Sequence, residues 1–347
     1  MKVDSLNRSE STFPSLWFHS SGRVARLIDR NAPTRRSDRL ATTIAQRTKR
    51  RGLHLGSAGR NQIAGMLFVL PWIIGFLAFT AYPILASLYY SFMQYDIINE
   101  PRFIGLSNFV FMFTKDTSFP VVVYNTVYIV ILGVPSALII SFLLAGLLNN
   151  KIVGRPLFRT FFFLPSIVPS IAVAMVWLWI YNPSYGLINA TIAAWGGQVI
   201  PWLGAPALAK LSLVIVSVWG QGATIIIFLA ALQDVPRELY DAAKVDGANG
   251  FRRFISVTVP LCTPSILFVL ITGFIGWFQY FTVGWIMTQG GPMQATEFYS
   301  IYLYRNAFSF FKMGYASALA WVLFMIIMLF TVITFRSSAR WVYYQGG

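Results

Sequence analysis

The chain has 347 residues, of which 56% are hydrophobic and 11% are charged, with a net charge of +15. A soluble domain carries about 25% charged residues, so this composition excludes an ordinary soluble protein and predicts one that crosses the membrane several times. The single cysteine, Cys262, excludes an internal disulfide and a CxxC metal site. The sequence also lacks an HExxH motif and a phosphate-binding loop. We therefore expect no metal, cofactor or ATP hydrolysis in this chain.

Residues 1–60 form a basic tail that is rich in Ser, Thr and Arg and has no sustained apolar stripe. Such a composition predicts a segment that is disordered or lies on the inner leaflet of the membrane. The string TRRSDRL at 34–40 resembles a twin-arginine export signal, but no apolar region follows it directly. Both histidines, His19 and His54, also lie in this tail.

The remainder, 61–347, is predicted to be a transmembrane domain. About 20 apolar residues form a helix long enough to cross a bilayer, and six segments qualify: 63–92, 120–148, 158–181, 211–232, 264–288 and 313–335. They contain no Asp, Glu, Lys or His, and Arg159 stands at the edge of the third. The expected fold is all-α and polytopic, with six transmembrane helices. Kinks are expected at the prolines inside these segments, namely Pro71, Pro83, Pro135, Pro165 and Pro169.

The distribution of Lys and Arg predicts the orientation. The tail at 1–60, the loops near 149–159 and 233–263 and the C-terminal tail hold 22 of the 27 basic residues, and the alternate loops hold five. Both termini are therefore expected on the cytoplasmic side. The positive charge then reflects orientation and attraction to the membrane surface, and nucleic-acid binding is the less favoured explanation.

The predicted spans are poor in ionisable groups, which limits the class of membrane protein. An intramembrane enzyme needs a nucleophile, an acid or a metal at depth, and an ion-coupled transporter normally keeps ionisable residues inside the membrane. A passive channel and a transporter driven by a partner protein both remain. The second possibility requires a docking site on the cytoplasmic side.

The segment at 234–260 is the candidate for this docking site. Pro236 suits a first helical turn, and Leu239, Ala242 and Ala243 are expected on one helix face. On the other face, Asp241 is spaced to pair with both Arg237 and Lys244.

A turn at Gly247 and Gly250 should follow, and then a second short helix that ends at Pro260. That helix combines apolar and charged residues: Phe251, Arg252, Arg253, Phe254 and Ile255. One interpretation is an interfacial helix on lipid headgroups. The alanine pair, which permits close approach, and the mixed charges favour a protein partner instead.

The same segment resembles the EAA loop of permease subunits of binding-protein-dependent ABC importers, which have the type I permease fold. The match consists of Asp241-Ala242-Ala243, Gly247, Val257, Val259 and Pro260 at the spacing of the motif. Asp241 replaces the usual Glu, and the two valines replace Ile and Leu. Further stretches over 60–340 resemble the sugar-importing branch: FIGLSNF at Phe103, YNTVYIV at Tyr124, RTFFFLP at Arg159, IFLAALQDVPRELYDAA at Ile227, TQGGPMQAT at Thr288 and GYASALA at Gly314.

The resemblance implies a permease subunit of an ATP-driven importer for a disaccharide or oligosaccharide, in the cell membrane of a bacterium or archaeon. It implies a second permease, two ATPase subunits that bind ATP and Mg²⁺, and an extracytoplasmic substrate-binding protein. Coupling to the ATPase would then depend on Glu238, Asp241, Ala242, Ala243, Gly247, Arg252, Arg253 and Pro260. An ATP-independent channel or a membrane scaffold is the alternative.

Sugars are bound by aromatic faces and hydrogen-bonding side chains, and transport sites lie near the middle of the bilayer. Two predicted spans carry such residues, namely Trp219 and Gln221 in the fourth and Trp277, Gln279 and Tyr280 in the fifth. The alternative is that the glutamines bond other helices and the aromatic rings only pack. The sequence leaves open which sugar is imported, which permease of the pair contacts it, whether the pair is homodimeric, and what the tail does. The lack of basic residues within the spans disfavours a phosphorylated substrate.

Overall fold

The computed structural model describes residues 57–150 and 153–343. The chain divides into two units, Met1–Pro71 and Trp72–Gly347. The first unit is described only at 57–71, in helix α2, so the predicted tail lies outside the described residues except for 57–60, which are helical. The second unit holds the rest of the fold.

The described residues are almost entirely helical, and the only sheet among them is one antiparallel pair of two-residue strands. The elements in chain order are α2 (Ser57–Phe76), η1 (Leu77–Ala81), α3 (Tyr82–Ser91), β1 (Met93–Gln94), β2 (Arg102–Phe103), α4 (Ser107–Thr114), α5 (Ser118–Asn149), α6 (Arg155–Ile167), α7 (Ser170–Ile180), α8 (Leu187–Ala194), α9 (Pro206–Trp219), α10 (Gly222–Gln233), α11 (Arg237–Val245), α12 (Gly250–Arg253), η2 (Phe254–Thr258), α13 (Val259–Phe278), α14 (Thr282–Thr288), α15 (Tyr299–Tyr304), η3 (Arg305–Ser309) and α16 (Met313–Ser338).

Four continuous helices in the described residues are long and apolar enough to cross a membrane: Gly65–Ser91, Ser118–Asn149, Gly250–Phe278 and Met313–Ser338. Two bent pairs also qualify, α6 with α7 and α9 with α10. With each pair counted as one span, the total is six. The predicted all-α polytopic fold is confirmed, although three of the spans differ in detail from the expectation.

The third span is not the straight helix expected at 158–181. Helices α6 and α7 meet at an angle of 102°. Val168, at the break, has extended backbone angles (φ −71°, ψ 132°) and precedes Pro169. Proline disfavours helical angles in the residue before it, which explains the position of the break.

The fourth span, expected at 211–232, is bent by 52° between α9 and α10. The bend lies at Gly220 and Gln221, and Gly222 begins the next helix. A Cβ on Gly222 would lie 2.7 Å from the Phe162 carbonyl oxygen and 2.9 Å from the Phe163 Cα. The glycine therefore lets α10 approach the backbone of α6 directly.

The fifth span is displaced from its expected position at 264–288. Its helix runs without interruption from Gly250 to Phe278, and α14 is a separate helix. The expected helix end at Pro260 is therefore wrong. The π-helical turn η2 precedes this proline, with the Val259 N–H donating to the Phe254 carbonyl. The proline has no N–H to place in the hydrogen-bond ladder, and a wider turn of this kind interrupts the ladder without ending the helix.

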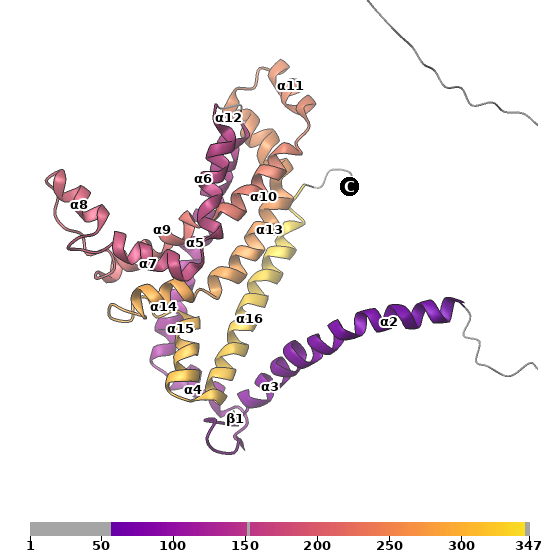
Figure 1. Ribbon diagram of the computed structural model, residues 1–347, viewed down its shortest axis with the longest axis vertical. Coiled ribbons are helices and arrows are strands. Elements are labelled where there is room, and N and C mark those ends of the chain that lie inside the picture. Colours follow the sequence, from indigo (N-terminus) through magenta and orange to yellow (C-terminus); the bar gives the residue numbers. More distant parts are fainter. Residues whose placement is uncertain (1–56, 151–152, 344–347) are drawn as a thin grey trace, which may run out of the picture. The chain divides into compact units, whose positions relative to one another are not determined.

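In the second unit, α5 packs against α9, α10 and α13, and α16 packs against α3 and α13. Helices α11 and α12 lie at one end of this unit, and α4 and α15 lie at the opposite end (Figure 1). Two hydrophobic clusters stabilise it. The larger one includes Val134, Trp277 and Leu319, and the second includes Phe142, Phe228 and Val235, toward the α11 end.

Asn125 and Thr126 in α5 fix the segment that leads into α15. The Asn125 amide donates to the Gln294 carbonyl at 2.7 Å, and the Tyr299 N–H donates to the Thr126 hydroxyl at 2.8 Å. Both side chains are buried.

Candidate functional site

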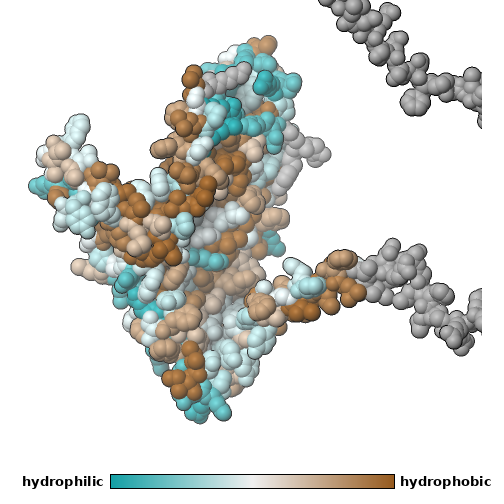
Figure 2. Space-filling view, in the orientation of Figure 1, coloured by the Kyte–Doolittle hydropathy of each residue, from teal (hydrophilic) through white to brown (hydrophobic). Residues whose placement is uncertain are grey.

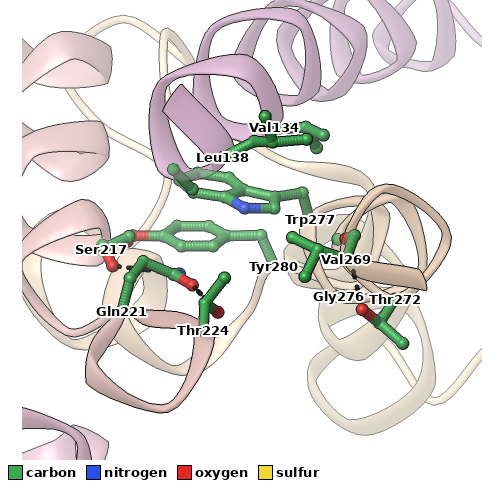
Figure 3. Close-up of a pocket in the computed structure, with 12 residues that line it drawn as sticks. Val134, Leu138, Ser217, Gln221, Thr224, Val269, Thr272, Gly276, Trp277 and Tyr280 are labelled. Atoms are coloured by element: carbon green, nitrogen blue, oxygen red, sulfur yellow. Dashed lines mark hydrogen bonds between the residues drawn. The ribbon is translucent and has the colours of Figure 1, made fainter. Parts of the chain in front are cut away.

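A cavity of about 290 Å³ lies between α5, α13 and the bend that joins α9 to α10. Its lining combines apolar residues of α5 with hydroxyl, amide and aromatic groups from the other helices (Figure 3). The residues with hydrogen-bonding or aromatic side chains are Ser217, Gln221, Thr224, Thr272, Trp277 and Tyr280. None of the lining residues is charged.

The aromatic side of the cavity is formed by Trp277 and Tyr280. Their rings are stacked with centroids 5.5 Å apart and an interplanar angle of 7° (Figure 3). Trp277 is buried, and its ring lies where a Cβ on Gly133 would be, only 2.3 Å away. The Tyr280 hydroxyl lies 2.9 Å from the Ser217 hydroxyl. These contacts fix both rings.

The polar side of the cavity is centred on Gln221, at the bend of the fourth span. Its Nε2 donates to the Ser217 carbonyl at 3.3 Å, and its Oε1 accepts from the Thr224 hydroxyl at 2.8 Å. An amide group offers two donors and two lone pairs. Within the described part of the chain, these bonds leave one N–H and one lone pair of Gln221 for a ligand.

The structure brings together three of the five residues predicted to line a substrate path: Gln221, Trp277 and Tyr280. Trp219 instead faces a separate apolar cavity, with its ring 5.8 Å from that of Trp177. Gln279 lines another cavity with residues of α15 and α16. The five residues therefore do not share one cavity, because the bend after Trp219 and the end of α13 at Phe278 turn neighbouring side chains in different directions.

The sequence interpretation missed three hydroxyl groups of the cavity. Ser217 and Thr224 flank Gln221 at four and three residues, and Thr272 precedes Tyr280 by eight. Spacings of three and four residues are those of neighbouring positions along a helix, although here a bend lies between Ser217 and Gln221. Polar residues at such spacing within an apolar span are the signal that could have found them.

Helix α11 forms the centre of the predicted coupling segment. A hydrogen bond joins α11 to η2, since the Tyr240 hydroxyl lies 2.9 Å from the Thr258 hydroxyl. Glu238, Asp241 and Ala242 are exposed, and Ala243 is half-buried. The helix therefore presents both acidic and small side chains on its exposed surface.

One of the two predicted ion pairs of α11 is present. Asp241 accepts from Lys244 at 2.6 Å, and this hydrogen bond lowers the pKa of the Asp241 carboxyl. The expected pair of Asp241 with Arg237 is not formed in the described structure. Arg237 instead lines a cavity with Arg155 and Arg159.

The turn after α11 depends on Gly247, which has a φ of +77°. L-residues with a side chain rarely adopt this conformation. The Ala248 N–H donates to the Ala243 carbonyl at 2.9 Å, and Asn249 caps α12 by accepting from the Arg252 N–H at 2.8 Å. Arg252 is exposed and Arg253 half-buried, and Pro260 lies in the first turn of α13.

The predicted coupling segment is thus a capped helix joined by a tight turn to a long transmembrane helix, in the region that resembled an EAA loop. Residues 137–342 match the family of the binding-protein-dependent transport system inner membrane component. The chain belongs to this family. The resemblance noted in the sequence is confirmed. As a membrane component of such a system, the permease is a non-catalytic subunit.

Known relatives are similar to the permease over most of their length. It is 43% identical over 294 residues to the "Probable ABC transporter permease protein YesP" of Bacillus subtilis (strain 168), covering 84% of this chain and 95% of that protein. It is 32% identical over 277 residues to the "Trehalose/maltose transport system permease protein MalF" of Thermococcus litoralis, covering 79% and 93%.

A solved structure has the same fold. The permease aligns with a chain of a bacterial alginate ABC transporter, crystallised with an alginate pentasaccharide-bound periplasmic protein, with a TM-score of 0.73. The alignment covers 83% of this chain and 98% of the other at 22% identity. This similarity supports the fold of the permease.

Proposed function

We propose that the permease, together with a second permease subunit, forms the translocation path of an ATP-driven importer for a disaccharide or oligosaccharide. The cavity of Gln221, Trp277 and Tyr280 is the observation that carries this proposal. Aromatic faces pack against the C–H surfaces of a sugar, and an amide and hydroxyl groups bond its hydroxyls. The stacked rings and the unused bonding capacity of Gln221 fit that chemistry.

The size of the cavity supports a shared path. Its volume of about 290 Å³ lies at the lower limit of small-molecule sites, which span about 300–1,000 Å³. We infer that this chain contacts one part of the sugar and that the second permease completes the site.

The names of relatives support a sugar or polyol substrate. One relative is named for trehalose and maltose, and another, from Agrobacterium fabrum, for sulfoquinovosyl glycerol. A third, from Yersinia enterocolitica, is named for sn-glycerol-3-phosphate. A phosphorylated substrate is less favoured here, because none of the residues lining the cavity is basic and a buried phosphate needs positive partners.

The test is uptake of labelled di- and oligosaccharides by the complete transporter in proteoliposomes. Gln221→Leu removes both hydrogen-bonding atoms and should raise the KM for uptake by about fivefold, equivalent to one hydrogen bond of about 1 kcal/mol. Gln279→Leu is the matched control, since it makes the same change outside this cavity. If both variants take up sugar with the wild-type KM, the cavity is not the substrate site.

We also propose that α11 and the turn at Gly247 couple the permease to two ATPase subunits, which bind ATP and Mg²⁺. The exposed Glu238, Asp241 and Ala242, with Ala243 beside them, would form the main contact. Arg252, Arg253 and Pro260 would transmit the motion, since the helix that begins at Gly250 continues to Phe278 beside the cavity. Such a rigid connection suits transmission between two states.

Ala243→Asp should abolish co-purification of the ATPase and ATP-dependent uptake, while leaving the amount of permease in the membrane unchanged. Ala193→Asp, in helix α8, introduces the same side chain away from α11 and serves as the control. Wild-type uptake and ATPase stimulation in Ala243→Asp would refute the coupling role. Uptake that continues without ATP would favour the alternative, an ATP-independent channel.

The proposed orientation places both termini and α11 in the cytoplasm. Val245 in α11 is 88% exposed, and Met293 in the loop before α15 is 90% exposed. In intact cells, a membrane-impermeant maleimide should label Met293→Cys but not Val245→Cys. The native Cys262 is 1% exposed and should contribute little background. The reverse labelling pattern would contradict this orientation.

A further inference from the structure

Three arginines converge on one cavity near the coupling segment. Arg155 and Arg159 come from the start of α6, and Arg237 comes from the start of α11. The cavity has a volume of about 560 Å³, and the rest of its lining is neutral: Asn149, Leu232, Gln233, Val235 and Tyr240. No carboxylate is among these lining residues.

Among the described side chains, Arg155 and Arg159 have no carboxylate partner. With its amide oxygen turned toward them, Gln233 accepts from Arg155 Nη2 at 3.2 Å and from Arg159 Nη2 at 2.9 Å. The Nε atoms of both arginines are buried and have no hydrogen-bond partner among the residues that the structure describes. In residues 65–150 and 153–343, ion pairs form only between Asp241 and Lys244 and between Glu297 and Arg305.

An anion would offset the charge repulsion and the unmet hydrogen-bonding capacity of this arrangement. Like charges close together repel, and a buried N–H without an acceptor costs free energy. Several guanidinium groups facing one cavity form the usual geometry for a phosphate group, whose oxygens accept forked hydrogen bonds. The lining of the cavity therefore offers the chemistry that binds a phosphate group.

The surroundings of the arginines indicate a lipid as the source of this phosphate. On the same helix, Leu157 is 71% exposed and Phe161 is 72% exposed. Helix α6 also belongs to one of the membrane-spanning pairs, and hydrophobic residues cover the surface along α6 and α7 (Figure 2). A headgroup at the arginines would thus place its acyl chains against an apolar surface, as expected for an anionic lipid at a membrane boundary.

We propose that this cavity binds the headgroup phosphate of an anionic phospholipid. The phosphate is held by Arg155 and Arg159 of α6 and by Arg237 at the start of α11. It thereby connects the membrane-spanning part of the permease to the coupling helix, and anionic lipid stabilises the position of α11. This site is separate from the sugar cavity and does not depend on the identity of the substrate.

The test is native mass spectrometry of the purified complex that contains the full chain, supplied with phosphatidylglycerol or phosphatidylcholine. Wild type should retain phosphatidylglycerol in preference to phosphatidylcholine. The double variant Arg155→Gln/Arg159→Gln should lose this preference by about tenfold. Arg340→Gln, which changes an exposed arginine near the C-terminus, is the matched control and should behave as wild type.

The experiment also includes a charge-preserving variant and a competition with inorganic phosphate. The charge-preserving variant Arg155→Lys/Arg159→Lys should retain most of the lipid preference, which separates loss of charge from misfolding. Inorganic phosphate should compete weakly, because it lacks acyl chains. Unchanged phosphatidylglycerol retention in the Gln variant would overturn the proposal. Complete displacement by inorganic phosphate would also overturn it, in favour of a soluble anion, and loss of ATPase co-purification with unchanged lipid retention would indicate a partner carboxylate instead.

Discussion

Gly133→Ala should displace the aromatic side of the cavity that we propose to bind sugar, by a purely steric effect. Gly133 is buried in α5, and a Cβ at this position would lie 2.3 Å from the Trp277 ring. The indole would have to move by about 1.1 Å to reach an ordinary contact of 3.4 Å. Overpacking of this kind costs about 1–3 kcal/mol. Because Trp277 is stacked on Tyr280, the movement should disturb both rings.

The expected result is a fivefold or greater increase in the KM for sugar uptake, since loss of an aromatic contact is worth about 1 kcal/mol. Binding of the ATPase should be unchanged. Gly146→Ala is the matched control, because it lies in the same helix and its Cβ would meet nothing within 4 Å. Trp277→Leu in the Gly133→Ala background should restore thermal stability without restoring the KM. A wild-type KM in Gly133→Ala, measured in proteoliposomes, would refute the reasoning that a fixed Trp277 contacts the sugar.

Three other predictions concern the turn after α11, a buried ion pair and a helix contact. Gly247→Val should reduce coupled ATPase activity, since left-handed backbone costs a β-branched residue at least about 1–2 kcal/mol, whereas Gly247→Asn should stay near wild type. Burial raises the pKa of Glu297, so Arg305→Met should destabilise the fold by about 2 kcal/mol. The raised pKa means that Glu297 becomes neutral more readily in the folded protein. The destabilisation caused by Arg305→Met should therefore shrink as the pH falls toward 5. In a Glu297→Gln background, Arg305→Met should cause no such destabilisation. Thermal unfolding would measure both effects. Gly222→Ala should lower the unfolding temperature by forcing α10 away from α6, whereas Gly276→Ala, with nothing within 4 Å, should not.

The sequence by itself determined the class of protein and the family. Membrane-spanning helices were predictable because a bilayer requires long apolar segments, a signal that depends on composition alone. The family was recognisable from the segment at 234–260 because its alanine pair, glycine and prolines are read at fixed local spacing. The left-handed turn at Gly247 followed from the same local rule.

Only the tertiary structure decided which polar residues share a cavity. Trp219 and Gln221 are two residues apart but face different cavities, because the fourth span bends between them. Pro169 breaks the third span at the residue before it. Pro260 does not interrupt the fifth span, because the wider turn η2 precedes it. A proline has the same chemistry in both places, and the turns around it decide the outcome.

The convergence of Arg155, Arg159 and Arg237 also required the tertiary structure. Arg155 and Arg237 are 82 positions apart, and the local spacing predicted a pair between Arg237 and Asp241. Local spacing permits such a pair. It does not decide whether Arg237 pairs with Asp241 or lines a cavity with residues that are distant in the sequence. That choice depends on how α6, α10 and α11 pack, which no single helix encodes.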